Sequence, residues 1–565
     1  MDMVTGMATD MDMEMRARKN IKSVQPASII GLCCFCSLAF AQSVSTGSDS
    51  GSAFSATNAS AATQTPPSAL GNSTSQGRAW VITPRIGVTE TYSDNVNVNA
   101  SNNKKQGDFT TEISPGIRVE ARAARLKAYL DYTLRGLFYA RESGYNQTQN
   151  SLNTFGTFEA VEKWLFLDFS ALIAQQAISA FGPQSPSNST INNNVTETAT
   201  YRLSPYIRGQ AGGLVDYLLR YNLSTTRSDA SAVSDTNISE WTGQLRGSTP
   251  FRNLKWTIDG SQQSVDYTRG RDTDSERIRG MLTYSLSPQF RVSASAGQES
   301  NNYASLDQKT NDTYGYGFDW NPTERTQISA FKERRFFGDG HNVSFSHRFP
   351  RSSIRFSDTR DVSVLPNQFT TVGFGSVYDL FYPLLANVEP YASMPPGAKE
   401  SAIANAIYSL FGVPANTQVT SSFLTSRATV QRRQQLGLTL TGIRNTITLM
   451  VSQGEDQSAL ASASSNDDFS QSNIVRQRGF SLNYSHRLSD ISNLNALASR
   501  QESTNSGTIT GTGNLKATTT IYQINLSTKL GAKTTGALSA RRSEFDSATN
   551  PYTENAIIGS VFFVY

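Results

Sequence analysis

The chain has 565 residues, of which 17% are charged and 38% are hydrophobic, and its formal net charge is +4. Aromatic residues make up 10%, which is too many for a disordered chain. The sequence also contains no run of 18 apolar residues that would predict a membrane-spanning helix. Its 50 basic and 46 acidic residues give no indication of a nucleic-acid partner. These properties favour a large all-β protein.

Residues 1–41 have the features of a secretory signal peptide. Basic residues at positions 16–22 precede an apolar run at 27–40, and the run ends in Ala39-Phe40-Ala41. This small-x-small pattern predicts cleavage between Ala41 and Gln42. A lipoprotein signal is the alternative, because the three cysteines of the chain lie in the same run, but no small-residue box precedes any of them. The mature chain is therefore expected to contain no disulfide and no thiolate metal site.

Two kinds of sequence follow the signal peptide. Residues 42–79 are rich in Ser, Thr, Ala and Gly and predict a flexible linker. From 80–565 the polarity alternates with a period of two, so that Leu130 and Leu482 share a face with apolar residues while Asp131 and Asn483 lie on polar faces. This pattern over about ten residues is typical of transmembrane β-strands, although a soluble sandwich has the same period. If the apolar face meets lipid, Arg at Leu130 or Leu482 is expected to be costly, and Arg at Asp131 or Asn483 mild.

The predicted connections between strands alternate in length. Short turns are expected at 120–123, 161–162, 209–213, 250–253, 287–288, 321–324, 350–351, 442–445, 489–492 and 531–533. Longer polar loops are expected between them, such as 94–107, 179–194, 229–236, 300–311 and 454–472. The alternation predicts a transmembrane antiparallel β-barrel of about 22 strands in the outer membrane, with short periplasmic turns and long outer loops. The final strand alternates to the terminal aromatic Tyr565, as is typical of outer-membrane barrels.

The polar faces contain the candidate pore-lining residues, because a charge that faces lipid is costly. These are Lys127, Asp131, Arg135, Arg334 and Arg487. No phosphate-binding, hydrolase or zinc-protease motif is recognised, and the chain has only three histidines, His341 in a predicted turn, His347 and His486. We therefore predict no enzymatic activity, no cofactor and no metal site. Mixed charges and many hydroxyl and amide groups suit a hydrated path for sugars, as they suit any water-filled barrel.

The segment 359–420 interrupts the alternation. Its apolar stretch at 377–386 includes Leu380 and Phe381, and a predicted helix at 396–412 places Ile403, Ile407 and Phe411 on one side. Such a loop can narrow the lumen, cap the mouth of the barrel or contact a partner. We expect it to fold inward as a plug or lid.

Several segments resemble one known family. They read WVITPRIGVTETYSDNV at 80–96, ISPGIRVEARAARLKA at 113–128, WLFLDFSALIAQ at 164–175, TYRLSPYIRG at 200–209, RRFFGDGHNVSFSHR at 334–348 and GIRNTIT at 442–448. Together they resemble the PEP-CTERM-system-associated outer-membrane proteins of exosortase and exopolysaccharide loci. The resemblance covers 80–565 and implies a barrel linked to polysaccharide export or to PEP-CTERM protein sorting.

Three functional classes remain open. The favoured one is a pore for exopolysaccharide, whose expected partners are outer-membrane lipid, polysaccharide, and envelope export or sorting components. The alternatives are a non-transporting barrel that anchors surface polymer or sorting machinery, and an outer-membrane enzyme, which the missing motif disfavours. A TonB-dependent receptor requires a folded plug domain ahead of the barrel, where only the linker 42–79 is expected.

Overall fold

The computed structural model describes residues 79–98, 105–230, 233–251, 253–364, 423–459, 467–470, 472–508, 515–548 and 550–565. All of them belong to the unit Thr57–Tyr565. The predicted signal peptide with its Ala41–Gln42 cleavage site and most of the linker lie outside the described residues. In the part of the chain that is described, no helix has the length and apolar character to cross a membrane.

Twenty-two strands make up nearly all of the described structure. They are β1 Trp80–Ser93, β2 Asp108–Arg122, β3 Leu126–Tyr139, β4 Gln147–Val161, β5 Leu165–Ala177, β6 Val195–Ala211, β7 Val215–Ser228, β8 Thr236–Ser248, β9 Leu254–Tyr267, β10 Thr273–Ser285, β11 Phe290–Asn301, β12 Lys309–Thr323, β13 Thr326–Arg335, β14 Gly338–Arg348, β15 Ser352–Ser363, β16 Thr429–Thr441, β17 Asn445–Ser458, β18 Ser472–Arg487, β19 Ser492–Thr508, β20 Lys516–Lys529, β21 Thr534–Ser547 and β22 Tyr552–Val564. Two 3-10 turns, η1 Ser143–Tyr145 and η2 Asp468–Ser470, lie in connections.

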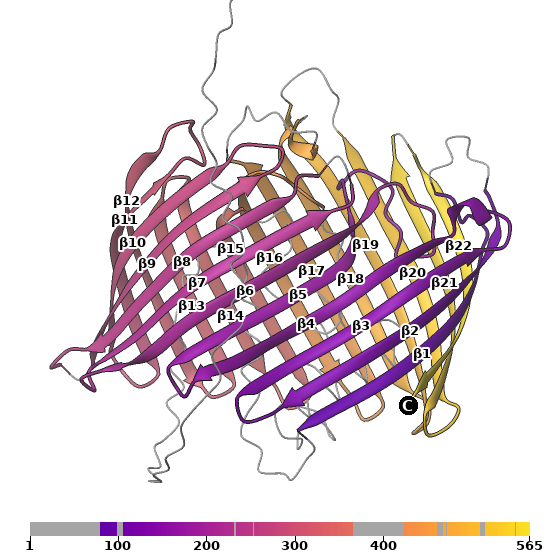
Figure 1. Ribbon diagram of the computed structural model, residues 1–565, viewed down its shortest axis with the longest axis horizontal. Coiled ribbons are helices and arrows are strands. Elements are labelled where there is room, and N and C mark those ends of the chain that lie inside the picture. The colour runs from indigo at the N-terminus through magenta and orange to yellow at the C-terminus, as the bar shows by residue number, and fades with distance from the viewer. Residues whose placement is uncertain are drawn as a thin grey trace, which may run out of the picture. The chain divides into compact units, whose positions relative to one another are not determined.

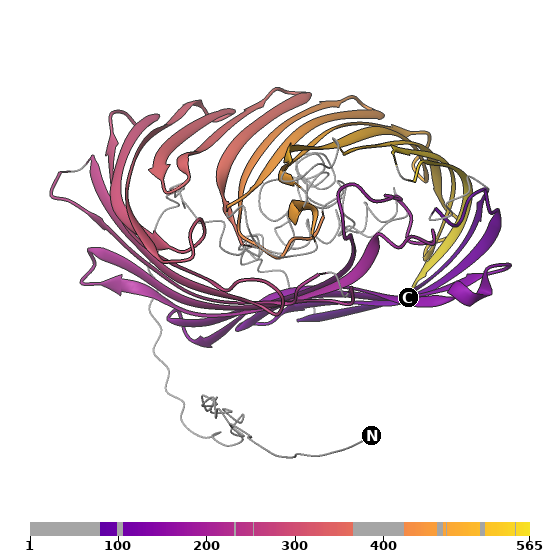
Figure 2. The ribbon, with the colours of Figure 1, turned by 90° about the horizontal axis from the view of Figure 1, so that it is seen from above.

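The strands form one closed antiparallel barrel (Figures 1 and 2). Each strand pairs with its neighbours in the sequence, and β1 pairs with β22 from Arg85↔Val564 to Ser93↔Ala556. Closure gives every strand two hydrogen-bonded neighbours, so the sheet has no open edge. The predicted all-β barrel of about 22 strands is confirmed.

The lengths of most connections sort by side as predicted. On the side where β1 begins and β22 ends, the connections contain between two residues (β12 to β13) and five residues (β8 to β9). Glycines at positive φ, Gly212 and Gly213, form the turn between β6 and β7. On the opposite side, the β1–β2 connection has 14 residues and the β5–β6 connection has 17. Three connections on this side are as short as those on the other: β13–β14 with two residues, β21–β22 with four and β9–β10 with five. The β13–β14 turn places His341 in β14 instead of in a turn.

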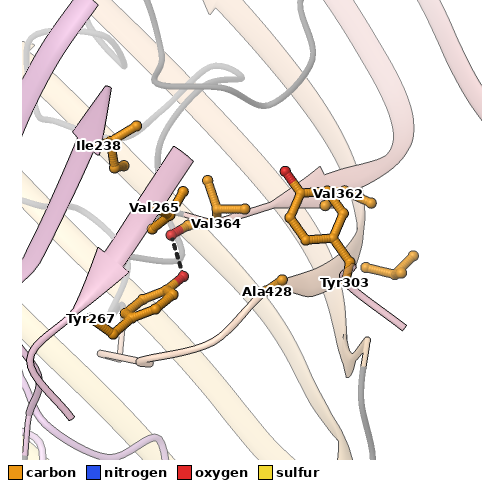
Figure 3. Close-up of a cluster of buried hydrophobic side chains, with 8 residues drawn as sticks. Ile238, Val265, Tyr267, Tyr303, Val362, Val364 and Ala428 are labelled. Atoms are coloured by element: carbon orange, nitrogen blue, oxygen red, sulfur yellow. Dashed lines mark hydrogen bonds between the residues drawn. The ribbon is translucent and has the colours of Figure 1, made fainter. Parts of the chain in front are cut away.

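The two faces of the sheet differ in polarity. Val265 of β9 belongs to the same buried apolar cluster as Val362 of β15, and residues on strands so far apart in the sheet can meet only across the interior (Figure 3). Asp259 lies on the same face of β9 as Val265, so the polar face points inward. Large apolar side chains such as Leu134, Phe480 and Leu482 are exposed on the other face. A closed barrel with an apolar outer band and a polar interior spans the outer membrane, where this chain is therefore located.

The inserted segment begins later than predicted. Strand β15 continues to Ser363, because Thr359 and Arg360 still pair in register with Asn342 and His341 of β14. Residues 365–422 lie outside the described residues, and with them the candidate plug residues Leu380, Phe381, Ile403, Ile407 and Phe411. The chain is described again from Phe423, which leads into β16.

Candidate functional site

The inner wall of the barrel is lined by ion pairs that join neighbouring strands. Asp131 of β3 accepts hydrogen bonds from Arg85 of β1, with Nη1 to Oδ2 at 2.9 Å, and from Arg118 of β2, with Nη2 to Oδ2 at 2.8 Å. The Tyr129 hydroxyl donates a further bond of 3.1 Å. Alternation turns these residues to one face, and the pairing of β1, β2 and β3 brings them together. The predicted Asp131 is therefore on the inner face, but its charge is balanced by two guanidinium groups.

Three other predicted residues lie on the inner face. Arg135 has its Nε 3.7 Å from a carboxylate oxygen of Glu112. Lys127 is half-buried near the start of β3. Arg487 ends β18 beside the short turn to β19, and it donates a 3.4 Å hydrogen bond to the carbonyl oxygen of Ile443. The structure does not bring these residues to one place, because they are spread along β3 and β18.

The prediction for Arg334 is wrong. Its neighbours Glu333 and Arg335 are buried on the inner face, whereas the side chain of Arg334 is 56% exposed on the outer face, 3.7 Å from Asp339. A shift of one residue in a strand reverses the face on which a side chain lies. Arg334 is next to last in β13, beyond the apolar Ile328 and Ala330 of the same face, so its charge does not meet the lipid core.

The more deeply buried ion pairs were not among the residues predicted from the sequence. Arg335 of β13 bridges Glu299 of β11, at 2.7 Å, and Asp361 of β15. Arg541 of β21 pairs with Glu554 of β22 at 3.0 Å. The period of two could have identified residues of this kind. On β13 it places Glu333 and Arg335 on the same face as the buried Phe331.

Uncharged polar groups share this wall. Ser295, Asn483, Asn525 and Ser527 lie on it, between the ion-paired clusters. In the described ranges, no group of three or more His, Cys, Asp and Glu side chains is arranged to hold a metal ion. The chemistry that the wall offers is hydrogen bonding to a hydrated solute, with most of its charge already paired.

The β5–β6 loop, residues 178–194, is tied to β22 and to the segment that follows β1. Ile191 exchanges backbone hydrogen bonds with Val96 and Val98 after β1, at 2.8 Å and 3.2 Å. The Tyr552 hydroxyl of β22 donates to the carbonyl oxygen of Gln184. Within the loop, the Asn194 amide donates to the carbonyl oxygens of Ser179 and Pro183. The predicted polar loop is thus a structured element on the side of the long connections.

A second segment crosses the mouth, and we call residues 423–428 the mouth strap. Phe423 forms a parallel bridge with Ala177 at the end of β5, and the Leu424 amide donates to the Ile178 carbonyl at 3.3 Å. Strands β5 and β16 are eleven positions apart in the sheet of 22, so the mouth strap spans the barrel from one side to the other (Figure 2). The side chains of Phe423 and Leu424 are only 0% and 2% exposed.

The turn η2 in the β17–β18 connection holds both segments. Arg427 of the mouth strap pairs with Asp467 at 2.7 Å. Asp468 accepts hydrogen bonds from the Ser179 hydroxyl at 2.6 Å and the Ala180 amide at 2.7 Å. Burial raises the pKa of Asp468 to about 6, against the lowering effect of these two bonds. The rings of Phe469 and Phe423 pack with centroids 6.0 Å apart.

An apolar cluster secures the other end of the mouth strap. Ala428 packs with Ile238, Val265, Tyr303 and Val362, and the Tyr267 hydroxyl donates to the Val364 carbonyl at 3.0 Å (Figure 3). Residues from β8, β9, β15 and β16 thereby meet inside the barrel. We call the β5–β6 loop, the mouth strap and η2, with this cluster, the mouth assembly.

No protein-family model and no curated protein matches the chain. Among solved structures, it is similar to the FrpB iron transporter from Neisseria meningitidis (F5-1 variant), with 9% identity over 86% of this chain and 83% of that chain and a TM-score of 0.47. The siderophore receptor PirA from Acinetobacter baumannii is 8% identical over 85% and 80%, with a TM-score of 0.42. The copper transporter OprC is 10% identical over 86% and 80%, with a TM-score of 0.33. Sequence identities and TM-scores this low do not indicate what the chain binds.

Proposed function

We propose that the chain is an outer-membrane pore that takes part in exopolysaccharide export, in association with the PEP-CTERM/exosortase system. The observation that carries the proposal is the polar, charge-paired inner wall, represented by Asp131 between Arg85 and Arg118. A sheet of 22 strands about 4.8 Å apart and tilted by about 40° has a circumference of roughly 140 Å. Such a barrel encloses room for a hydrated polymer.

The pairing of charges favours a solute that is hydrated but not strongly charged. A polysaccharide exposes hydroxyl groups that both donate and accept hydrogen bonds, and the serine and asparagine side chains of the wall can exchange such bonds with it. Paired carboxylates and guanidiniums leave little net field to hold or repel an ion. The resemblance to the PEP-CTERM-associated proteins supplies the expectation that the polymer is an exopolysaccharide.

The mouth assembly is the proposed constriction of this path. Phe423 and Leu424 of the mouth strap are buried against η2 and the β5–β6 loop. Opening requires the contacts to η2 and the β5–β6 loop to break. The pore is therefore proposed to be gated, with a closed resting state.

The buried contacts across the mouth also favour the alternative of a non-transporting barrel that anchors polymer or sorting machinery. Recording from the purified barrel in planar bilayers distinguishes the two. A pore gives discrete conductance steps that grow when the mouth assembly is loosened, and a deletion strain loses secreted polymer. A silent barrel whose deletion releases polymer from the cell surface would replace the pore with the anchor.

A further inference from the structure

On the outer face of the barrel, a group of basic residues lies just beyond the apolar band on β16 to β20. Strand pairing places Leu436, Val451, Phe480 and Arg500 in one row across β16 to β19. The next row toward the long loops contains Gln434, Gln453, Arg478 and Glu502, and the following row contains Arg432, Glu455, Arg476, Thr504 and Lys516. We call Arg432, Arg476, Arg478, Arg500 and Lys516 the outer basic belt.

The height of the belt matches the head groups of the outer leaflet. Phe480 and Leu482 are exposed on the lipid-facing side of β18, and Arg478 lies two residues before Phe480 on the same face, toward the long loops. Two residues advance a strand by about 7 Å. The belt therefore begins where the apolar band ends, on the side of the long loops.

Two of the five cations are available to a ligand. Arg432 is paired with Asp358 at 2.8 Å, Arg476 with Glu455 at 2.7 Å and Lys516 with Glu502 at 2.9 Å. Arg478 and Arg500 are exposed, and among the described residues neither forms an ion pair or a hydrogen bond through its side chain. Both interact electrostatically with Glu502, but that carboxylate forms its ion pair with Lys516.

Arg478 and Arg500 are also neighbours on the outer face. They lie at diagonal positions on β18 and β19, since Phe480 pairs with Arg500 and Arg478 with Glu502. Gln434, Gln453 and Phe480 lie beside them on the same outer face of β16, β17 and β18. Two guanidiniums and two amides above an aromatic ring provide donors for an oxyanion and an apolar floor for the chain attached to it.

The opposite arc of the barrel has the reverse charge. The corresponding outward positions of β9, β10 and β12 carry Asp266, Asp274, Glu276 and Asp312, all exposed. An anionic head group is therefore attracted to β16–β20 and repelled from β9–β12. This contrast identifies the belt as a surface for an anion anchored in the membrane.

We infer that Arg478 and Arg500, with Gln434 and Gln453, bind a phosphate group of the phosphorylated glycolipid in the outer leaflet. Guanidinium groups bind phosphate oxygens in pairs, and basic pockets on membrane proteins hold anionic head groups. The inference concerns the outer surface and does not depend on what passes through the barrel.

Native mass spectrometry of the detergent-purified full chain with a bisphosphorylated, hexa-acylated glucosamine disaccharide tests this. The variant R478Q/R500Q is expected to retain at least tenfold less of this lipid than the wild type, and R478K/R500K an intermediate amount. The control variant R227Q/K163Q loses the same charge from an outward position of β7 and from the β4–β5 turn, and it should bind like the wild type. Heat-modifiability on gels verifies that each variant is folded.

Two further arms identify the source of the phosphate. The dephosphorylated disaccharide is expected to bind the wild type no better than the phosphorylated lipid binds R478Q/R500Q. Inorganic phosphate at millimolar concentration is expected to displace little of the bound lipid. Wild-type binding by R478Q/R500Q, equal binding of the dephosphorylated lipid, or complete displacement by inorganic phosphate would each overturn the inference.

Discussion

Asp468 accepts a 2.6 Å hydrogen bond from the Ser179 hydroxyl, which joins η2 to the β5–β6 loop although 289 positions separate the two residues. The carboxyl group is buried, so its ionised form lacks most of the hydration that it has when the loops are apart. This contact makes the mouth assembly sensitive to pH.

The mouth is expected to close more firmly in acid. The pKa of Asp468 is about 6 in the docked loops and near 3.8 when it is exposed. Docking is therefore most favourable below pH 4, weakens as the pH rises from about 4 to 6, and is weakest above 6, by up to about 3 kcal/mol. Single-channel recording should show the open fraction falling between pH 7 and 4.

The variant D468N removes the ionisable group and keeps an acceptor for Ser179. Its open fraction should not change over this pH range, whereas D490N, in the short turn between β18 and β19, should retain the response. An unchanged pH response in D468N would assign the effect to another group.

Truncation of Phe423 should loosen the mouth strap. Its ring is fully buried against Phe469, and a buried Phe→Ala change costs about 3–5 kcal/mol. Because no strand is touched, F423A should remain heat-modifiable while its conductance and its permeability to oligosaccharides in liposome swelling increase. F251A, at an exposed side chain of the β8–β9 turn, is the matched control. An intact barrel with wild-type permeability would contradict a constriction at this place.

Because the outer face is apolar, a charged substitution there should destabilise the barrel more than one on the inner face. Leu482 is exposed near the middle of the lipid-facing side of β18, so L482R should destabilise the barrel by about 2–4 kcal/mol in urea titrations in lipid vesicles. S481R places the same side chain on the adjacent inner position and should cost less than 1 kcal/mol. Equal losses would indicate that both faces are buried in protein.

Asp131 on the inner wall is paired with two arginines, and its substitution is expected to change the ion selectivity of the barrel. Arg at Asp131 was expected to be mild, but Asp131 lies between two guanidiniums, so a third would be strongly destabilising. The smaller change D131N removes the carboxylate charge that Arg85 and Arg118 share and should cost about 3–5 kcal/mol. In the barrel that still folds, the reversal potential in a KCl gradient should shift toward anion selectivity.

The exposed carboxylate Glu162 in the β4–β5 turn provides the comparison for D131N. Its side chain is 70% exposed beside Lys163, so E162Q should leave both the stability and the reversal potential unchanged. A shift of the same size in E162Q would mean that net charge, and not the inner wall, sets the selectivity.

The class of fold, the approximate number of strands and most of the sorting of short and long connections could be predicted from the sequence. These follow from a period of two and from turn residues, which are local properties of the chain. The same period assigned Asp131 and Arg135 to the inner face. In the 331–335 stretch the same period puts Phe331, Glu333 and Arg335 inside and Arg334 outside, contrary to the prediction for Arg334.

Tertiary structure alone decided which residues meet. Arg85 and Asp131 are 46 positions apart and come together only through the registers of three strands. The mouth assembly joins Ser179, Phe423 and Asp468 across the barrel, and Arg478 and Arg500 become neighbours only through the pairing of β18 with β19. Alternation fixes the face of a side chain but carries no information about its partner, because partners are set by strand register and by the closure of the sheet.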